Sequence, residues 1–312
     1  MNNDEKKELN SVIDSGWFTE SSKTRQFEKM VADFVGVKYA CAVTSGTTAL
    51  YVGLKALGIG RGDEVIVPDL TFAASPNSVE AIGAKPILVD IEQDSLNLDL
   101  KKIKQSITKR TRAIMPVDFN GRPVDIKNIR KLANQHNLSL IEDAAHGLGC
   151  FYDKKHVGTM SDIGVFSFST PKIITTGQGG MIVTNDKKLY EKSSSLKNLS
   201  FGKKDRFNHD DIGWNYRMTN IQASLGVSQS NRINQIVRTK HKIGLEYYKR
   251  LKSNSNLYIP EIRKKYAKNI YWVVAILILN KKLKIDAKNM MKKLKAEGIA
   301  TRPFFWPMHM QK

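Results

Sequence analysis

The most informative segment of the chain is Leu140-Ile141-Glu142-Asp143-Ala144-Ala145-His146, in which an apolar run leads directly into two carboxylates. The run predicts a buried strand over Leu138–Asp143, because short apolar segments that end in turn residues are typical of such strands. An acid at the carboxyl end of a central strand points into the crevice where open α/β sheets bind ligands. Asp143 could there keep the nitrogen of a heterocycle protonated. A metal-binding acid and a helix-capping aspartate are the alternative interpretations.

Strands and helices alternate along the chain around this stretch. Apolar, β-branched runs predict strands at Glu64–Pro68, Lys85–Ile91, Arg112–Phe119, Ile163–Ser169 and Met181–Thr184. Amphipathic segments between them, such as Ala73–Ile82 and Asp125–His136, have the length of crossover helices. The alternation predicts an α/β fold with a three-layer αβα domain, in which helices cover both faces of a mainly parallel sheet.

The pattern changes after about Thr219. The expected elements are a long helix at Ile221–Leu251, a strand at Ile270–Leu279, a helix at Asp286–Glu297 and an extended segment at Ile299–Met308. We therefore expect a large ligand-binding domain over residues 1–220, whose N-terminal residues could pack on the small domain. Residues 221–312 are expected to form the linking helix and a smaller α+β domain that lacks its C-terminal portion.

Two further segments carry candidate chemistry. Thr44-Ser45-Gly46-Thr47-Thr48 follows an apolar run and begins a helix, so its free amides and the helix dipole could hold a phosphate, although a plain N-cap explains it too. Lys172 lies just beyond a buried strand, among hydroxyl residues and glycines, with no carboxylate nearby in sequence. Desolvation there lowers the pKa of a lysine and makes its amine a nucleophile toward an aldehyde, whereas a surface lysine is the ordinary alternative.

Composition and charge exclude several classes of protein. The longest apolar run, Ile270–Leu279, is half the length of a membrane span, and the N-terminus has no signal-peptide core. The two cysteines, Cys41 and Cys150, have no metal-ligand or disulfide spacing, which favours a reducing cytoplasm. The net charge is +20, and from Gln235 onward the chain has 19 Lys and Arg against 4 Asp and Glu. We interpret this charge as solvated helix faces, with some help in binding an anionic substrate, and expect no nucleic acid partner.

Seven motifs occur together in one order along nearly the whole chain. They are SGTTAL, GDEVIVPDLTFAAS, GAKPILVDI, IEDAAHGLG, FSFSTPKIITTGQGG, GWNYRMTNIQASLG and GIATRPFFWPMH. In these motifs the chain resembles the DegT/DnrJ/EryC1/StrS sugar aminotransferases. The resemblance implies the type I fold of pyridoxal-phosphate (PLP) dependent transferases, with a mainly parallel seven-stranded sheet and a smaller C-terminal α+β domain.

The resemblance also implies a role for each matching residue. Lys172 holds pyridoxal 5′-phosphate as an imine and shuttles the proton, while Asp143 pairs with the pyridine nitrogen. His146 lies near the ring hydroxyl, and Phe72 stacks on the ring, with core packing as the alternative for Phe72. The phosphate is held by Ser45, Gly46, Thr47 and Ser167, and by Asn215 from the neighbouring subunit. A homodimer with shared active sites follows from this last contact.

The implied reaction moves the amino group of L-glutamate to a keto group of a nucleotide-linked 4-keto-6-deoxy sugar. The TTGQGG segment favours C-4 over C-3, although Gln178 replaces the usual Glu, and the loop Trp17–Lys23 lacks the family's glycine. Arg217, Arg302 and His309 are candidate partners for a diphosphate or carboxylate, or else form structural ion pairs. The rival functions are another type I reaction, such as an aminodehydroquinate or 3-amino-5-hydroxybenzoate type synthase, and a cofactor-binding regulator without turnover.

Overall fold

A seven-stranded sheet forms the centre of the computed structural model, which describes residues 2–202, 205, 207–260, 265–279 and 285–311. The strand β9 is antiparallel to both of its neighbours, and all other pairs are parallel. The order across the sheet is β1 (Tyr39–Val43), β9 (Gly180–Thr184), β8 (Ile163–Ser167), β5 (Ser139–Asp143), β4 (Thr111–Ile114), β2 (Glu64–Pro68) and β3 (Lys85–Val89). The prediction of a mainly parallel α/β sheet is therefore confirmed.

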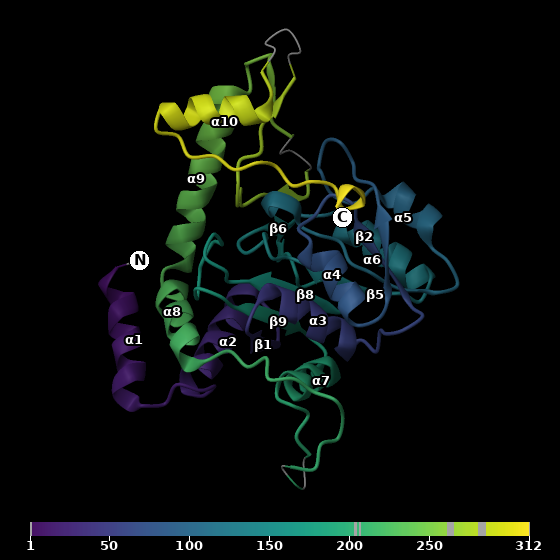
Figure 1. Ribbon diagram of the computed structural model, residues 1–312, viewed down its shortest axis with the longest axis vertical. Coiled ribbons are helices and arrows are strands. Elements are labelled where there is room, and N and C mark those ends of the chain that lie inside the picture. The colour runs from purple at the N-terminus through teal and green to yellow at the C-terminus, as the bar shows by residue number, and fades with distance from the viewer. Residues whose placement is uncertain (1, 203–204, 206, 261–264, 280–284, 312) are drawn as a thin grey trace.

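Helices cover both faces of this sheet and give it three layers (Figure 1). One face packs against α2 (Ser22–Val35), α5 (Leu100–Ser106), α6 (Ile126–Gln135) and α8 (Asn220–Ser230). The other packs against α3 (Gly46–Ala56), α4 (Ala74–Ala81) and α7 (Lys187–Lys197). Neighbouring residues of β1 illustrate the cause: Ala42 belongs to the first apolar cluster and Val43 to the second, because successive strand residues face opposite sides.

The predicted strands and crossover helices form, and most are one to four residues shorter than expected. The largest difference concerns Arg112–Phe119, since β4 ends at Ile114 and the chain then turns through the 3₁₀ segment Phe119–Gly121. Asn120 and Gly121 have positive φ angles of 55° and 78°, which end extended backbone. Because β4 ends early, the segment after it lies next to the end of β5.

The single long helix predicted over Ile221–Leu251 is wrong. The chain forms α8 and then α9 (Ile233–Leu251), with a turn at Asn231 and Arg232 between them. The α1 helix (Asn3–Ser15) packs on α8, and the Glu5 carboxylate accepts a hydrogen bond from the Arg232 guanidinium. This ion pair stabilises the turn between α8 and α9. The pattern of apolar residues does not predict that turn.

The strand predicted over Ile270–Leu279 is also wrong. Only Leu277–Ile278 (β12) is a strand, paired with Leu257–Tyr258 (β10). Tyr271 has a positive φ of 53°, and Ile270 donates its N–H to Gly121 O at 3.0 Å. The start of the apolar run is thus used for packing, with Ile270 buried in the cluster that covers one face of the sheet, whereas Leu279 at its end is 55% exposed.

The remaining strands and helices lie outside the seven-stranded sheet. A three-stranded sheet joins β11 (Ala267–Lys268), β6 (Phe151–Tyr152) and β7 (Lys155–His156). In the view of Figure 1 the α10 helix (Ala287–Ala296) crosses the upper end of α9, and the segment after it runs past β6 to the short helix η3 (Met308–Met310). Phe304 and Phe305 of this segment pack against Val117 and Phe119. Among the described residues no helix is both long and apolar enough to cross a lipid bilayer.

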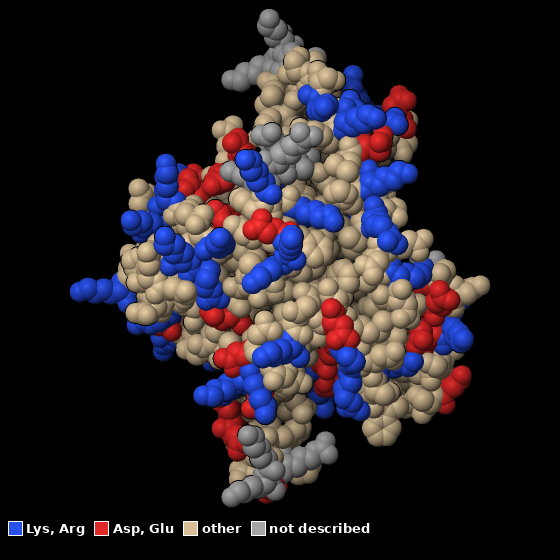
Figure 2. All heavy atoms as spheres, turned by 180° about the vertical axis from the view of Figure 1, so that it is seen from behind, with Lys and Arg blue, Asp and Glu red and all other residues tan. Residues whose placement is uncertain are grey.

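The basic side chains do not form one continuous patch on the face shown in Figure 2. Lys and Arg are interspersed there with Asp and Glu over most of the surface. Lysines of the chain also form exposed ion pairs, for example Lys102 with Asp90 at 2.7 Å. The distribution is typical of solvated helix faces.

Candidate active site

Lys172 lies in the loop after β8, with its backbone N–H bound to Ser169 O at 3.0 Å. Its Nζ lies 4.2 Å from the ring centroid of Trp272, against an aromatic face. Burial lowers the pKa of Lys172 to about 8, and the nearby Asp143 carboxylate opposes that shift. About a tenth of this amine is therefore unprotonated at pH 7, far more than for an ordinary lysine with a pKa of about 10.4, and only the unprotonated amine is a nucleophile.

Asp143 ends β5 and is buried. Its Oδ2 accepts a hydrogen bond from Ser75 Oγ at 2.8 Å, and its Oδ1 accepts one from the Ala145 N–H at 3.1 Å. Burial raises the pKa of Asp143, while these two hydrogen bonds and Lys172 act in the opposite direction. The fold thus brings Asp143 and Lys172 to the same end of the sheet, within electrostatic reach of each other.

His146 follows on the next turn and is also buried. Its ring stacks on Trp272 at 3.9 Å between centroids, with an angle of 15° between the planes. Burial, together with Lys172, lowers the pKa of His146 well below its ordinary value, so the imidazole is neutral. Sequence reasoning missed Trp272, because it lies within the run that predicted a strand, and an aromatic residue there signalled only core packing.

The N-terminus of α3 has the features of a phosphate cradle. Ser45 caps the helix by accepting the Thr48 N–H at 3.1 Å, whereas the Gly46 and Thr47 amides have no acceptor among the residues that the structure describes. A Cβ on Gly46 would lie 2.8 Å from Ser167 Cβ, so only glycine permits this approach. The cradle therefore joins the amides of Gly46 and Thr47 to the Ser167 hydroxyl, and this donor set fits a phosphate.

The other predicted residues are spread around this centre. Phe72 follows β2, is 56% exposed and contacts Phe305 edge-on with centroids 6.0 Å apart. Asn215 is exposed and accepts a hydrogen bond from Arg217 Nε at 3.0 Å. Asn215 and Arg217 lie on one segment, and Arg217 bridges to Val43 at the end of β1, next to the cradle.

Two of the candidate substrate residues have other surroundings. His309 Nδ1 lies 2.5 Å from Asp69 Oδ2, so this imidazole already has a carboxylate partner. Arg302 is exposed, and its guanidinium bonds the neighbouring Thr301 O at 3.4 Å. The hydrogen bond of Arg302 therefore lies within its own segment and involves neither Lys172 nor Asp143.

A cavity of about 320 Å³ lies between α9 and the loop that carries Lys172. Arg232 and Lys240 line it, and neither was predicted, because charged residues on a helix usually indicate only a solvated face. Burial lowers the pKa of Lys240, and Arg232 Nε is buried without an acceptor among the described residues. Because the Arg232 guanidinium is already paired with Glu5, Lys240 is the cation that this cavity offers beside the reactive lysine.

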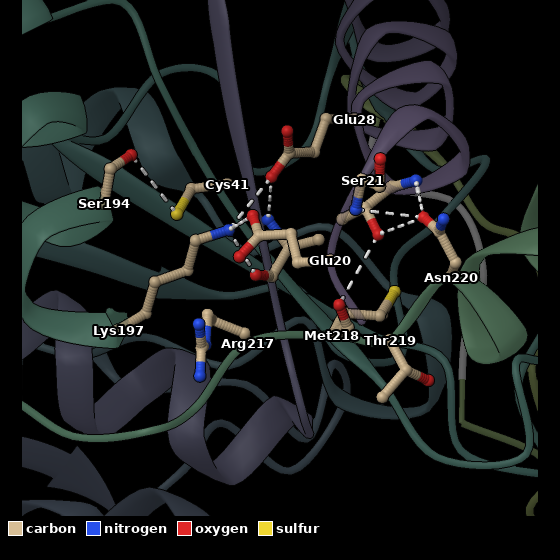
Figure 3. A network of polar contacts seen from close by, with 12 residues as sticks. Glu20, Ser21, Glu28, Cys41, Ser194, Lys197, Arg217, Met218, Thr219 and Asn220 are labelled. Atoms are coloured by element: carbon tan, nitrogen blue, oxygen red, sulfur yellow. Dashed lines mark hydrogen bonds and ion pairs between the residues drawn. The ribbon is translucent and has the colours of Figure 1, made fainter. Parts of the chain in front are cut away.

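A buried polar network fixes the loop between α1 and α2 (Figure 3). Asn220, the first residue of α8, accepts the Ser21 N–H at 3.0 Å and donates to Trp17 O at 3.1 Å. Lys197, at the end of α7, donates to Glu20 at 2.7 Å and to Glu28 at 3.2 Å. The loop, which lacks the family's glycine, is thereby held at both ends.

This fold, with a buried lysine opposite a carboxylate at the strand ends, is that of the type I class of PLP-dependent aminotransferases. The profile of the DegT/DnrJ/EryC1/StrS aminotransferase family matches residues 1–312, and the chain belongs to this family. It is therefore an aminotransferase, as the sequence predicted.

Named relatives and solved structures agree with this assignment. The chain is 38% identical to the GDP-perosamine synthase of Vibrio cholerae, with 99% of this chain and 84% of that protein covered. It is 41% identical to the GDP-perosamine synthase of Caulobacter vibrioides, with 95% and 80% covered. The crystal structure of DesV from S. venezuelae in complex with a ketimine intermediate superposes with a TM-score of 0.91 at 30% identity, covering 98% of this chain and 81% of DesV.

Proposed function

We propose that this aminotransferase binds pyridoxal 5′-phosphate and moves the amino group of L-glutamate to the C-4 keto group of a nucleotide-linked 4-keto-6-deoxy sugar, for glycan or polysaccharide synthesis. The enzyme works as a homodimer in the cytoplasm. The observation that carries the proposal is the Lys172 amine, whose pKa is lowered to about 8 by burial, at the same strand ends as the Asp143 carboxylate. The names of the two relatives favour GDP as the nucleotide.

Lys172 and Asp143 divide the chemical work. The cofactor, when bound, supplies an electron sink for the carbanion that forms at the amino-acid α carbon. Lys172 would hold the cofactor covalently, and its amine, when free, could move a proton as a general acid and base. Asp143 would pair with the pyridine nitrogen and keep it protonated, and the Ser75 and Ala145 donors fix the orientation of this carboxylate.

The remaining predicted residues bind and orient the cofactor. Gly46, Thr47, Ser45 and Ser167 hold the phosphate, which the free amides at the start of α3 support. Phe72 covers one face of the ring, and His146 approaches the ring hydroxyl as a neutral imidazole. Asn215 of a second subunit completes the phosphate site, and its exposed side chain supports that contact.

The substrate anions are bound by cations around the same centre. We retain Arg217, Arg302 and His309 for the nucleotide diphosphate or a substrate carboxylate, although the Asp69 partner weakens the case for His309. The cavity lined by Arg232 and Lys240 suits a carboxylate of the amino donor, because its positive charge adjoins Lys172.

The pH dependence of cofactor uptake reports on Lys172 directly. In cofactor-stripped protein, the rate of covalent attachment is expected to rise through a midpoint near pH 8, since only the unprotonated amine reacts and its pKa is about 8. Stopped-flow absorbance at a series of pH values measures this midpoint. The matched variant Asp143→Asn should lower the midpoint, because Asp143 raises the pKa of Lys172. A wild-type midpoint near 10, that of an ordinary lysine, would contradict the assignment.

A half-reaction assay tests the function as a whole. With cofactor bound, L-glutamate should bleach the visible band, and a GDP-linked 4-keto-6-deoxy sugar should restore it and yield an amino sugar with nitrogen on C-4. Bleaching without recovery on any 4-keto sugar nucleotide favours the rival synthases. Absence of bleaching by every amino acid favours the regulator without turnover.

A further inference from the structure

Two fully buried carboxyl groups lie behind Asp143. Glu142 precedes Asp143 in β5, and Asp118 lies in the turn after β4, where each is 0% exposed. Because successive residues of a strand face opposite sides, Glu142 points to the side of β5 away from the Asp143 carboxylate. None of the cofactor or substrate roles described above uses either group.

The Asp118 and Glu142 carboxyl groups lie on the same side of the sheet and lack a full set of donors among the described residues. Asp118 Oδ1 accepts the Val124 N–H at 3.0 Å, but Asp118 Oδ2 and both Glu142 oxygens have no donor among the described residues. Val117 bridges in parallel to Asp143, so Asp118 and Glu142 lie on neighbouring extended segments and point to the same side of the sheet, where Glu142 repels Asp118. Ionised carboxylates only accept hydrogen bonds, so two adjoining buried carboxyl groups without donors can satisfy each other only if one of them holds a proton. Burial raises the pKa of both groups, and repulsion by Glu142 raises that of Asp118 further.

The charged groups around Asp118 and Glu142 do not remove the need for this proton. Arg130 of α6 acts on Glu142 from a distance, but its guanidinium pairs with Asp162 at 2.9 Å. Asp143 on the same strand adds negative charge, and the nearby Cys150 thiol is neutral because burial raises its pKa well above the ordinary value. The Gly158 N–H and the Ser161 hydroxyl lower the pKa of Glu142, but neither makes a complete hydrogen bond to its oxygens.

The pair is connected to Asp143 through the backbone. The Asp118 N–H donates to Asp143 O at 3.1 Å, and the Asp143 N–H donates to Pro116 O at 2.9 Å. Asp118 Oδ2 also lies 3.1 Å from where a Cβ on Gly147 would be, so it packs under the turn that carries the Ala145 donor. Any separation of the two carboxyl groups therefore disturbs the turn that orients Asp143.

We propose that Asp118 and Glu142 share one proton at neutral pH and act as a positioning pair that holds the Asp143 turn in place. The role of Asp143 in this inference rests on the proposed function, but the shared proton does not. Loss of the proton would put two charges in contact inside the protein, push the Asp118 segment away from β5 and add negative charge behind Asp143.

Infrared spectroscopy of the cofactor-stripped full chain tests the shared proton directly. At pH 7 the wild type should show the carbonyl stretch of a protonated carboxylic acid, shifted in D₂O, and Asp118→Asn and Glu142→Gln should each lose it. Asp143→Asn should keep the band, which separates the pair from Asp143. A wild type without the band, or single variants that both retain it, overturns the proposal whatever the enzyme's reaction is.

Thermal unfolding against pH distinguishes a shared proton from mere packing. The folded pair holds a proton that unfolded carboxyls release above about pH 4, so wild-type stability should fall as pH rises toward the pKa of the pair. Asp118→Asn supplies its own N–H donor, so its melting temperature relative to wild type should increase by about 3 °C or more from pH 5 to pH 8. A difference that stays constant with pH overturns the proposal. For positioning, Asp118→Ala should weaken pyridoxal 5′-phosphate binding while Asp118→Asn preserves it, and equal binding by both variants overturns that role.

Discussion

Replacement of Lys172 by alanine should abolish covalent binding of the cofactor and lower turnover by about 10⁴-fold or more. The side chain has two tasks, attachment of the cofactor and proton transfer, and the described residues place no other amine against Trp272 within reach of Asp143. Borohydride reduction followed by peptide mapping measures the attachment, and the glutamate half-reaction measures turnover.

Lys240 provides the matched control for this experiment. It lines the same cavity, and burial lowers its pKa too, but it lies on α9 rather than in the loop after β8. Lys240→Ala should keep the reducible adduct on residue 172 and change mainly the KM for the amino donor. If Lys172→Ala retained the same adduct, another amine would hold the cofactor and the site assignment would be wrong.

Removal of the Lys197 side chain should give the largest loss of stability among the charged residues. Its Nζ donates to Glu20, to Glu28 and to Ala42 O at 2.9 Å, and the side chain is only 5% exposed. Although burial alone would lower it, the pKa of Lys197 is raised by Cys41 and the two glutamates. Lys197→Ala leaves these carboxylates partly buried and unpaired, at a cost of about 3–5 kcal/mol in the free energy of unfolding.

Denaturant unfolding of two variants of the same helix checks this expectation. Lys192→Ala removes the exposed ion pair with Asp211 and should cost about 1 kcal/mol or less. A triple variant, Lys197→Met with Glu20→Gln and Glu28→Gln, should recover most of the stability, because no buried charge is left without a partner. Equal losses for Lys197→Ala and Lys192→Ala would show that the network does not hold the loop.

The centre of the active site could be predicted because its signals are local. Asp143 ends a buried strand, Lys172 lies in the loop after another, and the Ser45–Thr47 segment begins a helix, so the strand ends bring them to one edge of the sheet. The apolar run at Ile270–Leu279 gave a wrong strand for a related reason. Composition predicts that such a run is buried, but only its first part is: Ile270 packs in a cluster of residues from other elements and bonds Gly121 O, whereas Leu279 is 55% exposed.

Local sequence patterns were enough to predict the sheet and the family, and they supplied Lys172 and Asp143 as candidate reactive residues, since periodicity and strand-end chemistry operate over a few neighbouring positions. Only the tertiary structure decided that Trp272 lies against Lys172 and His146, that Arg232 and Lys240 line a cavity, and that Asp118 meets Glu142. These contacts join residues from different elements, in most cases far apart in the chain, and their energies depend on burial. No local pattern encodes burial of a charged side chain, because the same residue is ordinary on a solvated surface and costly in the interior.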